Sequence, residues 1–211
     1  MIEIKSVSKS FKNKKLLEGI NYQFKEGKIY HIKGYNGSGK SVLLKIICGF
    51  SIPDQGAVII DGKQLGKDID FISNAGVSIN NDEFISYLNG YQNLKILLDI
   101  KKEVSEKEIE RYAKIFQLED DINKTIYKSY SQGMKQKLRL IQAIIENPKY
   151  LILDEPTKAL DKQAIETLYG LLKEFMRDKE KIIIFVTHSD DMIASLADEV
   201  LEIENYQLKQ V

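Results

Sequence analysis

The fold prediction starts from Gly34-Tyr35-Asn36-Gly37-Ser38-Gly39-Lys40-Ser41. The fixed positions of this segment fit G-x-x-x-x-G-K-[ST], the pattern of a phosphate-binding loop. Its glycines permit positive φ angles and let bare backbone N–H groups turn inward around a polyphosphate, where a Cβ atom would obstruct the approach. Lys40 can then reach the terminal phosphates, and the Ser41 hydroxyl can ligate Mg²⁺, which prefers oxygen ligands. We therefore expect the segment to hold a polyphosphate and its magnesium ion.

The residues on either side of this loop predict the strand and the helix that the motif requires. Ile29–Ile32 is apolar enough for a short strand, in which His31 is expected to pack beside the sheet. After the loop, apolar residues from Val42 to Ile47 indicate a helix that ends at Gly49. Strand, glycine-rich loop and helix therefore follow one another in the order that a phosphate-binding loop needs.

The composition predicts one soluble globular domain. The chain has 211 residues, of which 43% are hydrophobic, and its 31 basic residues balance its 31 acidic ones, so we expect no nucleic-acid partner. Cys48 is the single cysteine, which favours a buried thiol in a reducing cytoplasm. The N-terminus lacks the apolar core of a signal peptide, and the longest apolar run, Ile182–Val186, is too short to cross a bilayer. Any membrane-spanning partner is therefore expected to be a separate chain.

The first part of the chain predicts antiparallel strands, and the middle predicts helices. Met1–Phe24 has two apolar runs around a lysine-rich turn, and a strand at Ala57–Ile60 is expected to complete a β-meander. From about residue 81 to residue 146 the pattern becomes helical, with leucines at helical spacing near residue 94 and a second helix over residues 104–116. We expect this segment to be a helical subdomain inserted in the catalytic core.

The last part of the chain alternates helices with apolar strands. Ser131 can cap a helix that runs to Pro148, and the buried strand Tyr150–Leu153 follows it and ends in Asp154 and Glu155. Another helix leads to the strand Ile182–Val186. This alternation predicts an α/β fold with a mainly parallel sheet, whose strand ends carry the two carboxylates toward a site.

Taken together, these motifs resemble one family across nearly the whole chain, the ATP-binding subunits of ABC transporters. The loop at 34–41 resembles the Walker A motif of that family, and Leu151–Glu155 resembles its Walker B motif. Tyr130–Met134 stands at the place of its signature, and Lys158–Asp161 resembles its D-loop. The resemblance implies a P-loop NTPase core with an N-terminal antiparallel β subdomain and a helical insertion.

The resemblance also implies an ATPase site with named roles. Asp154, Ser41 and Asn80 would hold Mg²⁺, Glu155 would deprotonate the attacking water, and His188 would donate to the γ-phosphate. Phe11 would stack on adenine. The remaining nucleotide-binding residues are those of the D-loop and of the signature in the opposite copy: Asp161, Ser131, Gln132 and Gly133.

Two features depart from the family pattern. Asn80 stands where the family has a glutamine, so its amide is one methylene shorter and its metal contact is expected to be weaker or water-mediated. The signature has Gln132 in place of a glycine and Met134 in place of a glutamine. The continuation Gly133-Met134-Lys135-Gln136 resembles the branch that exports peptides, bacteriocins and drugs.

The resemblance further implies a head-to-tail dimer, either of two identical chains or with another ATPase subunit. A separate transmembrane permease would dock on the helical insertion and hold the dimer at the inner face of the cell membrane. Two alternatives remain open from the sequence. One is a soluble ABC ATPase in translation or DNA maintenance, although the chain has one cassette and no long heptad arm. The other is a regulatory nucleotide switch with low turnover.

Overall fold

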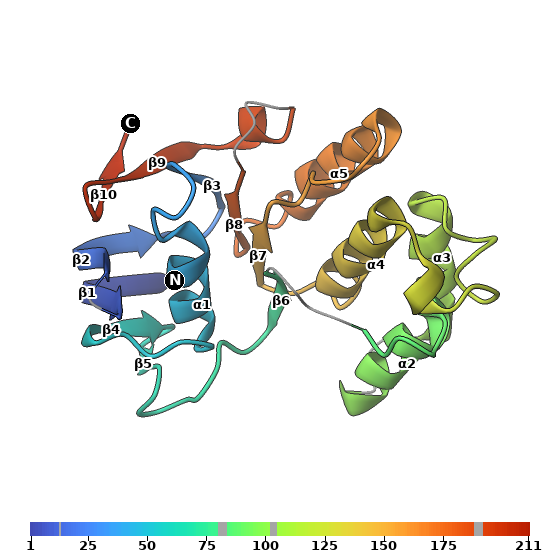
Figure 1. Ribbon diagram of the computed structural model, residues 1–211, viewed down its shortest axis with the longest axis horizontal. Coiled ribbons are helices and arrows are strands. Elements are labelled where there is room, and N and C mark those ends of the chain that lie inside the picture. Colours follow the sequence, from blue (N-terminus) through green and yellow to red (C-terminus); the bar gives the residue numbers. More distant parts are fainter. Residues whose placement is uncertain (13, 80–83, 102–104, 188–191) are drawn as a thin grey trace.

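The structure is a computed structural model that describes residues 1–12, 14–79, 84–101, 105–187 and 192–211. The predictions made for Asn80 and His188 lie outside these residues. Figure 1 shows an antiparallel sheet at one end of the molecule, a mainly parallel sheet in the middle, and helices at the other end. Within the described ranges, no helix is both long enough and apolar enough to span a membrane.

The central sheet has the order β10-β9-β3-β8-β7-β6. Its strands are β3 (Lys28–Lys33), β6 (Ala75–Ser78), β7 (Tyr150–Asp154), β8 (Ile182–Val186), β9 (Glu199–Glu204) and β10 (Gln207–Gln210). All neighbouring pairs are parallel except β9 with β10. The predicted parallel sheet is therefore confirmed, whereas β6, β9 and β10 were not expected from the sequence.

The second sheet is antiparallel and has the order β2-β1-β4-β5. Its strands are β1 (Ile2–Phe11), β2 (Lys14–Phe24), β4 (Gln55–Ile60) and the short β5 (Lys63–Gln64). Strands β1, β2 and β4 were predicted and β5 was not, and the expected meander order is wrong, because β1 lies between β2 and β4. β3, which follows β2 along the chain, is buried at nearly every position and lies in the parallel sheet instead.

Helix α1 (Lys40–Cys48) lies between the two sheets (Figure 1). Its Leu43 and Leu44 belong to one apolar core together with Ile4 of β1 and Ile184 of β8. Gly49 ends the helix as predicted, with φ of 85° and its N–H directed to carbonyl oxygens of the last turn. The position of α1 in the core holds the preceding loop rigidly at the carboxyl end of β3.

The opposite face of the central sheet is covered by α4 (Gln132–Ile144) and α5 (Lys162–Phe175). Alternate residues of β7 point to different cores, since Ile152 packs toward α1 while Leu151 and Leu153 pack toward these helices. This double burial explains why Leu151–Leu153 of β7 is an unbroken apolar run.

Three further elements pack around α4 and complete the helical end. They are α2 (Gly90–Lys101), α3 (Glu106–Ile115) and the 3₁₀ turn η1 (Tyr127–Ser129); a second turn, η2 (Ala194–Leu196), precedes β9. Leu94 of α2, Ile109 of α3 and Leu138 of α4 share one core. Helix α3 begins after Ser105, close to the predicted start.

Candidate functional site

The predicted phosphate-binding loop joins β3 to α1, and its backbone has the glycine conformations that such a loop needs. Gly34, Gly37 and Gly39 have φ angles of 143°, 82° and 105°. A Cβ atom on Gly34 would lie 2.7 Å from Ser38 Oγ and 2.9 Å from the Ile203 carbonyl oxygen. The loop therefore requires a glycine at position 34, both for its φ and for the space around it.

Lys40 is folded back onto the loop that precedes it. Its side chain is 5% exposed, and Nζ donates to the carbonyl oxygens of Gly34 at 2.7 Å and Tyr35 at 3.0 Å. Burial lowers the pKa of Lys40, and the carboxylates of Glu155 and Asp154 partly offset that effect. The ammonium group is thus held ready at the loop, where an anion can replace the carbonyl oxygens as its partner.

The loop also contains a buried hydroxyl that lacks a partner. Ser38 is 3% exposed, and its Oγ makes no hydrogen bond within the described part of the chain. An unsatisfied buried polar group costs about 1–3 kcal/mol. Such a hydroxyl, in a loop with three glycines at positive φ, fits the oxygens of a bound phosphate.

Both strand-end carboxylates lie across a cavity from this loop. The cavity has a volume of about 780 Å³, and we call it the phosphate-loop cavity. It is lined by Lys14, Leu16, Asn36, Gly37, Gly39, Lys40, Ser41, Val42, Asp154, Glu155 and Lys158. The structure therefore brings the loop and both carboxylates together in one space. Lys14 and Leu16 were not predicted to be there.

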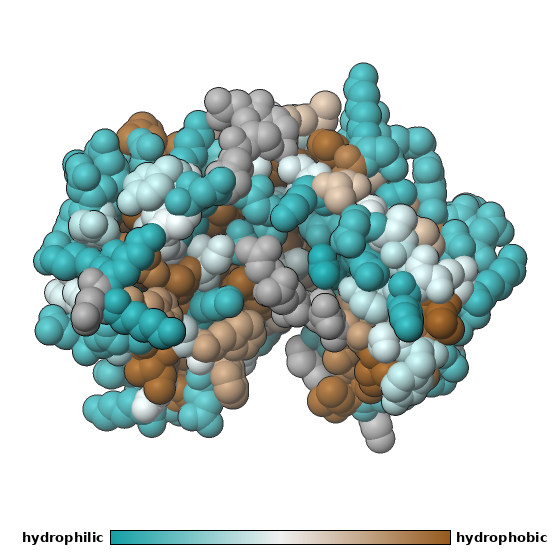
Figure 2. All heavy atoms as spheres, viewed as in Figure 1, coloured by the Kyte–Doolittle hydropathy of each residue, from teal (hydrophilic) through white to brown (hydrophobic). Residues whose placement is uncertain are grey.

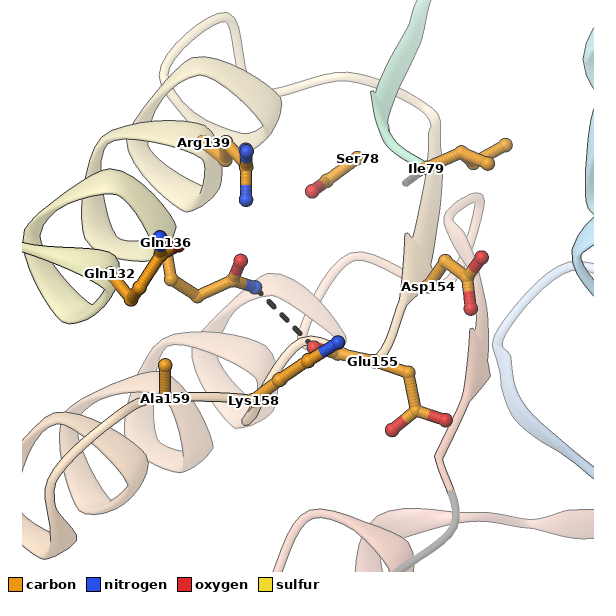
Figure 3. Close-up of a pocket in the computed structure, with 9 residues that line it drawn as sticks. All are labelled: Ser78, Ile79, Gln132, Gln136, Arg139, Asp154, Glu155, Lys158 and Ala159. Atoms are coloured by element: carbon orange, nitrogen blue, oxygen red, sulfur yellow. Dashed lines mark hydrogen bonds between the residues drawn. The ribbon is translucent and has the colours of Figure 1, made fainter. Parts of the chain in front are cut away.

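The backbone turns sharply between the two carboxylates. Asp154 is the last residue of β7 and is buried, whereas Glu155 follows with φ of 49° and its N–H donates to the Val186 carbonyl oxygen at 2.8 Å. Figure 3 shows the two carboxylates leaving the chain in different directions. They can therefore serve different chemistry, one on a metal ion and one on a water molecule.

The residues present fit a magnesium ion that is shared with phosphate. No cluster of three or more His, Cys, Asp and Glu residues forms a metal site among the residues that the structure describes. Mg²⁺ is commonly held by one or two protein oxygens, with water and substrate phosphates completing the shell. Ser41 and Asp154 both line the phosphate-loop cavity and supply such a small donor set.

The signature segment, Tyr130–Met134, lies at the start of α4. Ser131 caps the helix as predicted, because its Oγ accepts a hydrogen bond from the Met134 N–H at 3.2 Å. Ser131 and Gln132 are exposed to solvent. None of Ser131, Gln132 and Gly133 is among the residues that line the phosphate-loop cavity of the same chain. Within one chain, these three residues therefore lie outside the lining of the phosphate-loop cavity.

Neither Asp161 nor Phe11 is among the residues that line the phosphate-loop cavity. Asp161 caps α5 by accepting from the Ala164 N–H at 2.8 Å, and this hydrogen bond lowers the pKa of its carboxyl group. Phe11 ends β1 with half of its surface exposed, and Lys9 Nζ lies 5.2 Å from its ring centroid. The exposed ring leaves a face on which a planar base can stack.

His31 has the structural role that was expected, although it lies in the sheet and not beside it. Its ring stacks on Phe185 at a centroid distance of 4.7 Å. Nε2 lies 3.4 Å from the Thr187 carbonyl oxygen.

A second cavity separates α4 from the segment that follows β7. We call it the α4–loop cavity; its volume is about 350 Å³. Figure 3 shows the residues that line it: Ser78, Ile79, Gln132, Gln136, Arg139, Asp154, Glu155, Lys158 and Ala159. Asp154 and Glu155 therefore line both cavities: they share the phosphate-loop cavity with the glycine-rich loop and the α4–loop cavity with α4.

An apolar groove lies between the strand-rich part and the helices. Its volume is about 580 Å³, and the apolar side chains that line it are Phe50, Ile72, Ala75, Val77, Phe84, Ile85, Ile96 and Leu97. Figure 2 shows hydrophobic side chains on both sides of a notch at this place. Phe50, Ile85, Ile96 and Leu97 are all exposed. A groove of this kind fits an apolar helix of another chain.

Comparison with known proteins agrees with this geometry. The ABC transporter family matches residues 17–158. The uncharacterized ABC transporter ATP-binding protein YybJ of Bacillus subtilis (strain 168) is 38% identical over 209 residues, covering 99% of this chain and 95% of YybJ. The bacitracin transport ATP-binding protein BcrA of Enterococcus faecalis is 31% identical, covering 95% of this chain and 65% of BcrA. The methionine import ATP-binding protein MetN of Clostridium acetobutylicum is also 31% identical, covering 100% of this chain and 68% of MetN.

The fold agrees with solved structures as well. A dimeric structure of the ATP-binding cassette MJ0796, bound to ADP and Pi in a post-hydrolysis state, superposes with a TM-score of 0.87. It is 25% identical in sequence, and the match covers 100% of this chain and 98% of the other.

Proposed function

Because this chain belongs to the ATP-binding proteins of ABC transporters and is therefore an ATP-binding ATPase, we propose that residues 34–41, Asp154 and Glu155 form its hydrolytic site. The observation that carries the proposal is the phosphate-loop cavity, which joins the glycine-rich loop, Lys40 and both carboxylates. Phosphoanhydride hydrolysis depends on positioning and charge neutralisation, and this cavity places the groups for both in one space.

The phosphate-binding loop positions the nucleotide. Its N–H groups and the Ser38 hydroxyl would donate to the phosphate oxygens, and Lys40 would exchange two carbonyl oxygens for the terminal phosphates. Ser41 and Asp154 would hold Mg²⁺, with Asn80 as a predicted further ligand. The bound ion supplies positive charge for the phosphate oxygens.

Glu155 is the proposed general base. Its side chain lines the cavity next to Asp154 but leaves the backbone in a different direction, so it can accept a proton from a water molecule that attacks the terminal phosphate. His188 is the proposed hydrogen-bond donor to the same phosphate. In these assignments Asp154 supplies a metal ligand and Glu155 supplies a base.

We propose that the complete site needs two copies, arranged head to tail. Ser131, Gln132 and Gly133 do not line the cavity of their own chain, yet they stand at the N-terminus of a 13-residue helix, which favours an anion. A second ATPase subunit, identical or homologous, would bring this helix start to the phosphates. Phe11 would stack on the adenine, and Asp161 would lie at the dimer interface.

The apolar groove is the proposed docking site of a separate membrane permease, which would keep the subunit at the cytoplasmic face of the membrane. Residues 81–146 would act as the helical subdomain that carries one wall of the groove, since Ile96 and Leu97 of α2 line it. Co-purification with a permease after Leu97→Glu tests this assignment. Undiminished recovery of the complex would rule the groove out.

We further propose that the substrate is exported and is a peptide or a drug-like molecule. The support is the Gly133–Gln136 sequence and the similarity to a bacitracin transport protein. The direction of transport needs a test, because a relative of the same sequence identity is named for methionine import. In vesicles whose ATPase subunits face outward, export moves a labelled peptide inward when ATP is added outside, and outward movement would contradict the proposal.

The central experiment is Glu155→Gln. We expect the variant to bind ATP normally while hydrolysis slows by about 10²-fold or more, because the amide cannot accept the proton. Glu166→Gln is the matched control, since Glu166 is an exposed carboxylate on α5 and should lose no activity. Steady-state turnover of Glu155→Gln close to that of the wild type would disprove the assignment.

A further inference from the structure

Gln136 is a buried polar residue of α4 to which the proposed mechanism gives no role. Its side chain is 6% exposed. The amide nitrogen Nε2 donates to the Pro156 carbonyl oxygen at 3.0 Å and lies 3.4 Å from the Glu155 carbonyl oxygen. Figure 3 shows the side chain reaching from α4 across the α4–loop cavity to the backbone of Glu155.

The backbone that Gln136 contacts is strained. Glu155 has φ of 49°, a left-handed conformation that a non-glycine residue adopts at a cost on the order of 1 kcal/mol or more. The Glu155 N–H donates to the Val186 carbonyl oxygen at 2.8 Å, which ties it to β8. Pro156 has no N–H, so its own backbone can be hydrogen-bonded only through its carbonyl oxygen. Gln136 Nε2 donates to that oxygen and also reaches the Glu155 carbonyl oxygen, which accepts from the Lys158 N–H at 3.1 Å as well.

Helix α4 contacts the same segment at two further points. A Cβ atom on Gly133 would lie 2.9 Å from the Ala159 carbonyl oxygen, and Lys137 Nζ lies 3.5 Å from the Asp161 carboxylate. Positions 133, 136 and 137 share one face of the helix. Among these three contacts, only that of Gln136 reaches Glu155 itself.

We propose that Gln136 is a positioning residue for ATP hydrolysis. By donating to the carbonyl oxygens of Glu155 and Pro156, it fixes the backbone turn that aims the Glu155 carboxylate, and it links the signature helix α4 to the hydrolytic site within one chain. The inference rests on the proposed role of Glu155 as the base. A displacement of α4 would reach Glu155 through this amide.

The first test replaces the amide by a side chain of similar length that cannot donate. Gln136→Met should lower kcat by about tenfold while leaving the ATP dissociation constant unchanged, since the loop at 34–41 stays intact. Gln207→Met is the matched control, because the Gln207 Nε2 also donates to a backbone carbonyl oxygen, that of Glu18 at 2.6 Å, and Gln207 lines neither cavity. A wild-type kcat for Gln136→Met would overturn the proposal.

A second measurement separates a slower hydrolysis step from a loss of folded protein. Rates are expressed per nucleotide bound, so that unfolded chains are not counted. If Gln136→Met leaves too little folded protein, Gln136→Glu gives the same test, because an ionised carboxylate of the same length cannot donate to the two carbonyl oxygens.

The deciding experiment is a double-mutant cycle, measured by single-turnover hydrolysis. If Gln136 acts through Glu155, then Gln136→Met has no further effect on the residual rate of Glu155→Gln, because the group it aims is already absent. A full multiplication of the two losses would overturn the proposal. Near wild-type turnover of Glu155→Gln alone would overturn the proposed function and this inference with it, whereas a slow Glu155→Gln with a fully active Gln136→Met would overturn the inference only.

Discussion

Lys40 places a buried positive charge at the phosphate-binding loop. Lys40 has two carbonyl oxygens as partners at its own loop, and these are weaker partners for an ammonium group than phosphate oxygens are. Its burial lowers its pKa, which reflects the cost of keeping a charge out of water. The loop therefore holds a charge that a polyphosphate can neutralise.

We expect Lys40→Ala to weaken ATP binding by about tenfold or more, the loss associated with a charge-assisted hydrogen bond. Isothermal titration calorimetry measures this directly. Lys45→Ala is the control, since Lys45 lies in the last turn of the same helix, away from the cavity lining. Equal ATP affinity in the Lys40→Ala variant and the wild type would contradict the role given to this side chain.

Among single residues, the sequence predicts those functional side chains that belong to local sequence patterns. The loop at 34–41, the carboxylates after β7 and the Ser131 cap each depend on neighbours in sequence, so they could be placed in advance. Lys14 and Gln136 could not be. Lys14 lies near Gly37, and Gln136 contacts Pro156, only because distant elements pack together.

At the scale of elements, burial on both faces decides which strands the sequence reveals. β7 and β8 are buried at every position, so their apolar runs predict them well. β6 was missed because its Ala75–Ser78 sequence consists mostly of small residues. These residues are small because α4 packs closely against the strand: a Cβ atom on Gly76 would lie 1.7 Å from the Ala143 carbonyl oxygen.

Replacing glycine by alanine is expected to have opposite effects on the stability of the fold at positions 76 and 170. Gly76→Ala should destabilise the fold by about 3 kcal/mol, because β6 or α4 must move to admit the methyl group. Gly170→Ala should stabilise it by about 1 kcal/mol, because Gly170 lies inside α5 with nothing within 4 Å of the added atom. Urea unfolding measures both. A Gly76→Ala variant as stable as the wild type would show that the strand and helix are not packed as described.

At the scale of the whole molecule, helix α4 connects the apolar groove, where a permease is proposed to dock, with the proposed nucleotide site. Gln142 of α4 lines the apolar groove, and Gln136 of the same helix contacts the segment after β7. The first residues of α4 do not line the phosphate-loop cavity of their own chain. In the proposed dimer, the start of α4 in one subunit would meet the phosphate-binding loop of the other.

The head-to-tail dimer can be tested by placing two different lesions in one mixed dimer. Lys40→Ala damages the site that contains the loop of its own chain. Ser131→Arg damages the site that contains the loop of the opposite chain, because the larger side chain enters the space meant for the phosphates. Neither variant alone can form an intact site. A dimer of the two has both defects in one site and none in the other.

Mixing the two variants should therefore restore ATP-dependent pairing, with one occluded nucleotide for each mixed dimer. Adding Glu155→Gln to both chains slows hydrolysis, so that the closed state lasts long enough for measurement. Differential tags identify mixed dimers, and filter binding counts the retained nucleotide. Turnover is a poorer measurement, because coupling between the sites can silence a dimer with one damaged site. If occlusion in the mixture equals the average of the separate variants, each chain must form its site alone, and the head-to-tail arrangement is wrong for this protein.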